Sequence, residues 1–119
     1  AVISRGKKVP GGFCGMAGCC GAAVSAGIFL SVILKATPMS KEEWALSNRM
    51  TSRCLEAVSR IGGPRCCKRD SYTTILAAAE FLREELGKPL GVSDEILCSH
   101  FGGNAECLKV ECPYFTNSC

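Results

Sequence analysis

The sequence is poor in the residues on which most enzyme sites depend. His100 is the only histidine among 119 residues, and no serine stands in a nucleophile elbow. A Ser-His-Asp triad would therefore have to be built on His100. The carboxylates fall mostly on predicted helix faces, where water or a neighbouring Lys or Arg normally solvates them. Any chemistry is accordingly expected to depend on sulfur or on a bound metal, and the sequence leaves open whether the chain is an enzyme.

Excess charge, aromatic residues and long apolar runs are also scarce. The chain has 14 Lys and Arg against 11 Asp and Glu, and a net charge of +3 is too small to indicate nucleic-acid binding. Aromatic residues make up 7% of the chain, too few for a base-stacking surface. The most apolar segment, residues 22–34, is shorter than the roughly 20 residues that a membrane-spanning helix needs. The sequence predicts no nucleic-acid partner and no membrane partner.

No secretory leader is recognisable, because a Pro-Gly-Gly turn follows the basic residues Arg5, Lys7 and Lys8 where an apolar run should stand. The 10 cysteines would also suit a secreted disulfide framework. A chain of this length, however, can bury a core without covalent staples. We therefore expect a cytoplasmic thiol or metal protein, with a secreted disulfide protein as the alternative.

Three helices are predicted from apolar spacing and from glycine and proline punctuation, over residues 20–35, 40–61 and 70–86. One further helical turn is expected over residues 93–97. The fold class is all-α, a compact bundle of three main helices with cysteine-rich connecting loops and an irregular cysteine-rich C-terminal tail. Residues 1–119 are expected to form a single domain, either the C-terminal part of a longer protein or a stand-alone version.

Side chains that could cap two of the helices are visible in the sequence. Ser40 and Glu43 have the spacing of a capping box at the start of the second helix. Asp70 or Ser71 is expected to cap the third helix. The first helix carries small residues on one side and large ones on the other, which predicts burial on most sides.

The first group of cysteines lies in a glycine-rich stretch directly before the first predicted helix, and comprises Cys14, Cys19 and Cys20. Thiols at a helix N-terminus have a lowered pKa, because unpaired backbone N–H groups stabilise the thiolate. Glycines also allow the backbone to approach a bound anion or cluster closely. No Lys-Ser/Thr pair follows and no strand precedes the stretch, so a nucleotide-binding loop is not expected.

The second group is the pair Cys66 and Cys67. Neighbouring side chains diverge, so one metal ion is not expected to take both thiols. Either one of them ligates while the other faces the core, or each serves a different site. Arg65, Lys68 and Arg69 surround the pair, and their charge would favour thiolates and offset a negatively charged cluster. The alternative is a solvated basic loop.

The third group lies in the tail, where Cys107 and Cys112 form a C-x4-C spacing followed by a proline. A proline after the last cysteine is familiar in iron–sulfur loops. No C-x2-C spacing occurs, which removes the most specific zinc-ribbon and thioredoxin signatures but leaves zinc at wider spacings open. His100 either completes a Cys/His site with Cys98 or lies at the surface. Cys119 ends the chain.

Several motifs occur together in the order typical of one family. They include Gly11-Gly12-Phe13-Cys14-Gly15, Cys20-Gly21-Ala22-Ala23, Thr37-Pro38-Met39-Ser40-Lys41-Glu42-Glu43-Trp44, Gly62-Gly63-Pro64-Arg65-Cys66-Cys67 and Cys112-Pro113-Tyr114-Phe115. Over nearly its whole length the chain resembles an uncharacterised cysteine-rich domain family of methanogenic archaea and anaerobic bacteria.

Members of that family are sometimes attached to methyltransferase-like or radical-type modules. The resemblance therefore implies an accessory role beside a protein partner or beside an N-terminal region that this chain lacks. Cys19, Cys54 and Cys119 fall outside the family pattern, and Cys54 lies on the core stripe of the second helix, where a structural role is expected. A weaker similarity, to redox proteins with a C…GCAxxG…C…C signature, is limited to the glycine-rich stretch. The matching cysteines are Cys14, Cys20, Cys66, Cys67, Cys98, Cys107 and Cys112.

The leading hypothesis is a metal-binding module in which these seven thiolates converge on one end of the bundle. They would hold an iron–sulfur cluster, of the four-iron type, for electron transfer or as an accessory to a larger enzyme. Zinc is the alternative metal. A second hypothesis is a metal-free redox or sulfur-transfer enzyme with Cys20 as a low-pKa nucleophile and Cys14 as the resolving thiol. The third is a domain merely held together by zinc or disulfides.

Overall fold

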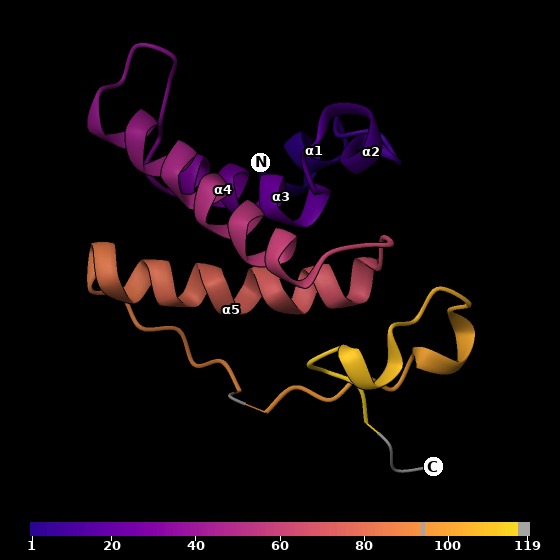
Figure 1. Cartoon of the computed structure of the whole chain (residues 1–119). Helices are drawn as coiled ribbons and strands as arrows, with labels where there is room; N and C mark the ends of the chain where they lie inside the picture. Colours follow the sequence, from indigo (N-terminus) through magenta and orange to yellow (C-terminus); the bar gives the residue numbers. More distant parts are fainter. Residues whose placement is uncertain (94, 117–119) are drawn as a thin grey trace.

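The computed structural model describes residues 1–93 and 95–116, and most of these residues are helical (Figure 1). The long helices α3, α4 and α5 pack against one another, and α1 packs on α3. The described residues form no strand, only an isolated bridge between Cys98 and Phe115. The predicted all-α bundle of three main helices is confirmed. The elements are α1 Val2–Gly6, α2 Phe13–Ala17, α3 Gly21–Ile33, α4 Glu42–Ile61, α5 Cys67–Leu86, η1 Phe101–Gly103 and η2 Lys109–Glu111.

The core lies between the three long helices and is built from apolar side chains at helical spacing. Cys54 is completely buried within it, and its Sγ–H donates to the Thr74 carbonyl at 3.8 Å. Burial raises the pKa of the Cys54 thiol to about 11, so it stays protonated and packs as a small hydrophobe. The core role predicted for Cys54 is confirmed. Its neighbours in the core are Ala23, Ala26, Leu30, Met50, Ala77, Phe81 and Leu82.

The small side of α3 faces α4, because only small residues let the two helix backbones approach closely. A Cβ added at Gly27 would run into the Thr51 hydroxyl and lie 3.4 Å from the Ser47 carbonyl oxygen. The large side is less well covered than the sequence predicts, since Ile33 remains 57% exposed. With only 13 residues, α3 is also short, and no helix in the described part of the chain is long and apolar enough to cross a membrane.

Replacing Gly27 with alanine is expected to destabilise the fold by about 1–2 kcal/mol, because the added methyl group overpacks the contact between α3 and α4. Urea unfolding of the variant would measure the loss. Gly21→Ala is the matched control, since nothing lies within 4 Å of a Cβ at that position. Adding Thr51→Ala to Gly27→Ala should restore part of the stability. An unchanged midpoint for Gly27→Ala would contradict the close packing.

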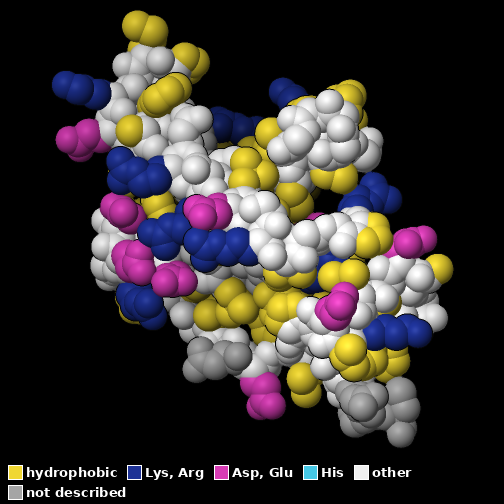
Figure 2. All heavy atoms as spheres, viewed as in Figure 1, with side chains coloured by type: hydrophobic (Ala, Val, Ile, Leu, Met, Phe, Trp, Pro, Cys, Tyr) yellow, Lys and Arg dark blue, Asp and Glu magenta, His cyan; other side chains and the backbone are white. Residues whose placement is uncertain are grey.

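Charged side chains gather over α4 and α5 on the face that Figure 2 shows. Arg53 contacts Glu84 at 2.8 Å and Arg49 contacts Glu85 at 3.3 Å. Exposed pairs of this kind contribute about 0–1 kcal/mol each. The signs are mixed and the charges are paired, so this face has the character of an ordinary solvated surface.

The helix starts differ from the predicted ones. The Ser40 hydroxyl accepts the Thr37 N–H at 2.9 Å within the preceding turn, so it does not cap α4, which begins at Glu42. The predicted capping box is therefore wrong. α5 begins at Cys67, earlier than predicted, because Cys66 is already extended (φ −139°, ψ 105°) and takes the N-cap position.

Other local differences concern the two ends of the chain. The helices α1 and α2 form where the sequence predicts no helix. The helical turn expected over residues 93–97 is absent from the part of that segment that the structure describes, residues 93 and 95–97.

The tail runs back along α5 to the helix start (Figure 1). Its far end is fixed by Tyr114, whose hydroxyl lies 2.8 Å from Thr73 Oγ1 and whose ring packs edge-on against Tyr72. The Cys98 N–H donates to the Tyr114 carbonyl at 2.7 Å. Tyr114 is the single buried side chain among the described tail residues. Few contacts therefore hold the tail, and they place it at the start of α5.

Candidate functional site

The seven predicted cysteines are divided between two pockets that share no cysteine. Cys66 and Cys67 separate, because their side chains diverge from adjacent positions at the start of α5. The expectation of one shared sulfur site is therefore wrong, and the alternative in which each of the pair serves a different site fits the structure. We call the two pockets the tail pocket, with Cys66, Cys98, Cys107 and Cys112, and the N-terminal pocket, with Cys14, Cys20 and Cys67.

The tail pocket is small and enclosed, with a volume of about 50 Å³. Its four cysteines come from two segments, the start of α5 and the tail, that are more than 30 positions apart. Aromatic rings close much of the remaining wall, including Tyr72 and Tyr114, and Phe101 packs on Phe115 at 5.0 Å between ring centroids. Four thiols thus line a small and mostly apolar space.

Two sulfurs in the tail pocket accept backbone hydrogen bonds. The His100 N–H donates to Cys98 Sγ and the Lys109 N–H donates to Cys107 Sγ, each at 3.3 Å. Both donors stand two residues after the cysteine, and Lys109 adopts a left-handed φ of 53°, a conformation that costs a non-glycine residue about 1–2 kcal/mol. Two of the four sulfurs in the tail pocket therefore have a backbone N–H donor.

Arg69 adds a buried positive charge to the wall of the tail pocket. Its side chain is 2% exposed, and its Nη2 donates to the Gly62 and Pro64 carbonyls at 2.7 Å each. Nε finds no hydrogen-bond partner among the described residues and lies 3.8 Å from Asp70 Oδ1. A buried cation is costly unless negative charge lies nearby. The sequence predicts that the charge of Arg69 favours the neighbouring thiolates, with a solvated basic loop as the alternative, but nothing in the sequence signals its burial.

His100 also lines the tail pocket, but its ring is largely exposed. Nδ1 lies 3.4 Å from the Ser99 hydroxyl. His100 thus lies at the wall of the tail pocket and is also exposed at the surface. Its position does not decide between the two predicted roles, completion of a Cys/His site with Cys98 and a surface location.

The N-terminal pocket is larger and more open, with a volume of about 360 Å³. Cys14 reaches it from α2, Cys20 from the N-cap position of α3, and Cys67 from the first residue of α5. Arg65 and Asp70 also line it. An adjoining hollow of about 650 Å³ beside the end of α4 shares Cys14 and Cys20.

The electrostatics of Cys20 differ from the expected low-pKa nucleophile. Burial raises the pKa of the Cys20 thiol, the N–H groups of Ala23 and Ala22 oppose this, and the neighbouring Asp70 carboxyl raises it further. Burial likewise raises the pKa of Asp70. The low-pKa prediction is therefore wrong, because burial and a nearby carboxylate outweigh the helix N-terminus. The sequence predicts Asp70 only as a helix cap. Its i+3 spacing from Cys67 puts both residues on one helix face, and this could have indicated that Asp70 lies in the same pocket as Cys67.

Residues 1–115 match the model of a family of unknown function (DUF5714). The chain belongs to this family. No curated protein and no solved structure matches it. Both cysteine pockets of this DUF5714 chain lie within the matched residues. Membership of an uncharacterised family over nearly the whole chain is thus confirmed.

Among the remaining cysteines of the DUF5714 chain, Cys19 and Cys54 line neither pocket. Cys19 is half-buried, Cys54 belongs to the core, and Cys119 lies outside the described residues. All nine described cysteines are free thiols. As they are placed within residues 1–93 and 95–116, no three Cys, His, Asp or Glu side chains lie close enough together to hold one metal ion.

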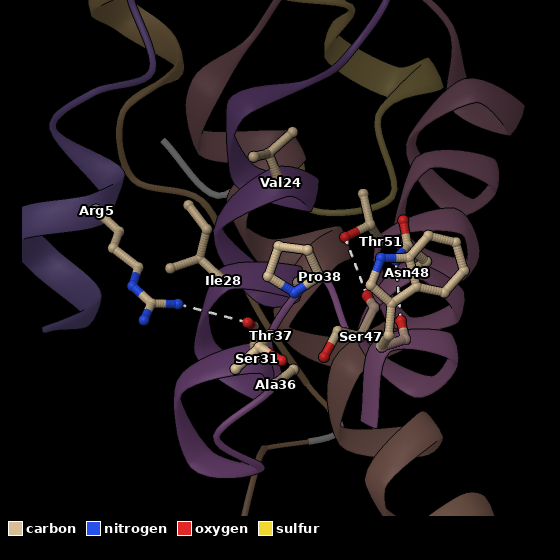
Figure 3. A pocket seen from close by; sticks show the side chains of 12 residues that line it. Arg5, Val24, Ile28, Ser31, Ala36, Thr37, Pro38, Ser47, Asn48 and Thr51 are labelled. Atoms are coloured by element: carbon tan, nitrogen blue, oxygen red, sulfur yellow. Dashed lines mark hydrogen bonds between the residues drawn. The ribbon is translucent and has the colours of Figure 1, made fainter. Parts of the chain in front are cut away.

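A further hollow of about 630 Å³ lies between α1, α3 and α4 and contains no cysteine (Figure 3). Three of its polar side chains are already engaged by their own helix: Thr51 Oγ1 donates to the Ser47 carbonyl, Asn48 Nδ2 donates to the Trp44 carbonyl, and Ser47 Oγ donates to the Glu43 carbonyl. Arg5 reaches across from α1 to the Ser31 hydroxyl at 3.4 Å. This hollow offers a ligand few free polar groups, so the two cysteine pockets are the stronger candidates for chemistry.

Proposed function

We propose that the chain is a metal-thiolate protein whose tail pocket holds an iron–sulfur cluster of the four-iron type. The cluster serves electron transfer, in the chain's own right or as an accessory to a larger enzyme. The observation that carries this proposal is the meeting of Cys66, Cys98, Cys107 and Cys112 in one enclosed pocket. Four thiolates are the usual complement of such a cluster.

The surroundings of the four thiols support an anionic metal centre. A thiolate-ligated cluster carries net negative charge, which the buried Arg69 would balance. The N–H bonds to Cys98 and Cys107 would stabilise that charge further, and hydrogen bonds to sulfur together with exclusion of solvent set the reduction potential of such clusters.

The tail is built so that it can close on a metal. The four sulfurs, as they are placed, could not hold a single metal ion, so the tail must rearrange on metal binding. It offers little resistance, because Tyr114 is its one buried side chain among those described. Metal binding would then supply much of the free energy that orders the tail, as it does in other small metal-stabilised segments.

An electron-transfer or accessory role implies a protein partner that exchanges electrons with the cluster. Three of the four ligands lie in the tail, on the outside of the bundle (Figure 1), where a partner protein can approach them. A reducing compartment such as the cytoplasm would keep the thiols free for ligation, as the nine described cysteines are.

Anaerobic purification of the full chain tests this function. We expect a brown protein with broad absorbance near ~400 nm and about four iron and four sulfide per chain. Reduction by dithionite should bleach the colour, since the cluster accepts an electron. A colourless, iron-free, reduced protein would overturn the proposal.

The small, closed volume of the tail pocket favours a second candidate, a structural zinc ion on the same four cysteines. Structural zinc sites are closed and four-coordinate. The same purification separates the two, because zinc would give a colourless protein with about one zinc per chain.

A further inference from the structure

We propose that the N-terminal pocket is a second metal site, in which Cys14, Cys20 and Cys67 bind one thiophilic divalent ion such as Zn²⁺ and leave one coordination position open. The site uses none of the tail cysteines and therefore stands independently of the proposed cluster.

The donor set is the first argument. Three thiols reach one pocket from three different elements, α2 and the starts of α3 and α5. Ions such as Zn²⁺ prefer thiolate sulfur, and a coordinating thiol loses its proton on binding. The two neighbours in sequence, Cys19 and Cys66, are directed elsewhere. The grouping therefore selects three of the five thiols available in these segments.

The position of the pocket supports negatively charged sulfur. α3, with 13 residues, and α5, with 20 residues, both begin at it, and neither helix has a side-chain hydrogen bond from its N-cap residue. N–H groups at both helix starts, among them those of Ala22 and Ala23 beside Cys20, contribute positive potential to the pocket. Arg65 adds a full positive charge to the wall. Burial and the Asp70 carboxyl favour the protonated Cys20 thiol in the metal-free pocket, so the bound ion itself must displace the proton. Three thiolates around one divalent ion carry a net charge of about −1, which Arg65 and the helix starts would partly balance.

The shape of the pocket distinguishes this site from the tail pocket. Its volume of about 360 Å³ leaves space beside the thiols, and glycines such as Gly11 and Gly21 form part of the wall. Zinc sites with three protein ligands and an open position are the reactive kind, whereas closed four-ligand sites are structural. Asp70 lies beside Cys20, where its carboxyl can accept a hydrogen bond from water or a small ligand bound to the ion.

The α2 segment can bring Cys14 to the ion. Gly12 and Gly18 flank α2 with left-handed φ angles of 78° and 67°, and nothing lies within 4 Å of a Cβ built at either. α2 itself has no buried residue. The three thiols, as the described residues place them, do not lie close enough together to hold one ion. Two glycine pivots around an unburied helix permit the shift that metal binding requires.

Cobalt titration of the metal-free, reduced full chain tests the site, because sulfur ligation to Co²⁺ gives charge-transfer bands and tetrahedral geometry gives strong visible bands. The titration is made on the Cys98→Ser/Cys107→Ser variant, in which the tail pocket is disabled. We expect about one Co²⁺ per chain, the number a single site binds. Added 2-mercaptoethanol should shift the visible bands, since its sulfur can take the open position.

Adding Cys14→Ser or Cys67→Ser to that variant should weaken Co²⁺ binding by at least about 100-fold, more than the loss of an outer-shell group costs. Cys67 is exposed, so its replacement leaves the fold intact, and circular dichroism verifies this. Cys19→Ser, beside Cys20 but outside the pocket, is the matched control and should bind Co²⁺ normally.

Absence of Co²⁺ binding in the tail variant, binding that Cys14→Ser and Cys67→Ser leave unchanged, or visible bands that 2-mercaptoethanol does not move would overturn this inference. Its failure is distinguishable from failure of the proposed function. A missing N-terminal site leaves the wild-type chain brown, whereas a missing cluster leaves the chain colourless but still able to bind Co²⁺ in the tail variant.

Discussion

Replacing Cys107 with serine is expected to remove the tail metal centre and to release the tail from α5. A four-ligand centre that loses one thiolate should bind its metal at least about 100-fold more weakly. Because Tyr114 is the one buried side chain of the described tail, metal binding provides most of its order. Hydrogen exchange should therefore show residues 95–116 opening in the variant while α4 and α5 keep their protection. Removing the metal from the wild-type chain with a chelator should produce the same pattern.

Cys19→Ser is the control for this comparison, since Cys19 is half-buried but lines neither pocket. It should keep the metal and a protected tail. A Cys107→Ser chain whose metal content and tail protection match the wild type would show that Cys107 is not a ligand and that the tail is held by its protein contacts alone.

Replacing Arg69 with methionine is expected to lower the free energy of unfolding by about 3 kcal/mol in the metal-free chain. The change removes two charge-assisted hydrogen bonds, to the Gly62 and Pro64 carbonyls at 2.7 Å each, and such bonds contribute about 1.5–3 kcal/mol. In the metal-loaded chain the loss should be larger, because the guanidinium also balances the thiolate charge. Urea unfolding of both forms measures the two values.

Arg65→Met is the matched control in the metal-free chain, since Arg65 is exposed and its loss there should change stability by no more than about 0.5 kcal/mol. Arg69→Lys separates charge from geometry. It should unfold almost as easily as Arg69→Met but should keep more of the metal affinity. Equal losses for Arg69→Met with and without metal would contradict a role for Arg69 in balancing a metal-thiolate centre.

Much of the fold could be predicted because its signals are local. Each of the helices α4 and α5 ends directly before a glycine, Gly62 and Gly87, which marks the helix end in the sequence. The apolar residues of α4 that share a face with Cys54 predict which side of the helix is buried. The start of α5 was missed because the turn after Gly62 positions Cys66 as N-cap, and the acidic residue that would normally cap a helix lies inside the first turn. Ser40 was misassigned because a competing turn at Thr37 uses its hydroxyl.

The site could be predicted only in part, because its arrangement depends on contacts between distant segments. Divergence of Cys66 and Cys67 follows from elementary geometry, and the structure agrees with it. The return of the tail to α5 depends on the contact between Tyr114 and Thr73, 41 positions apart, which no local pattern reveals. The burial of Arg69 depends on the Gly62 and Pro64 carbonyls of the preceding turn, and no local sequence pattern predicts it either.

The adjacent pair Cys66 and Cys67 offers the most direct test of the account, because the two thiols differ by one position and line different pockets. Native mass spectrometry of the anaerobically purified full chain would measure the bound cluster in Cys66→Ser and in Cys67→Ser. We predict that Cys66→Ser loses the mass of the iron–sulfur cluster and that Cys67→Ser retains it. Loss of the cluster from both variants or from Cys67→Ser alone, or its retention in both, would contradict a cluster held by Cys66, Cys98, Cys107 and Cys112.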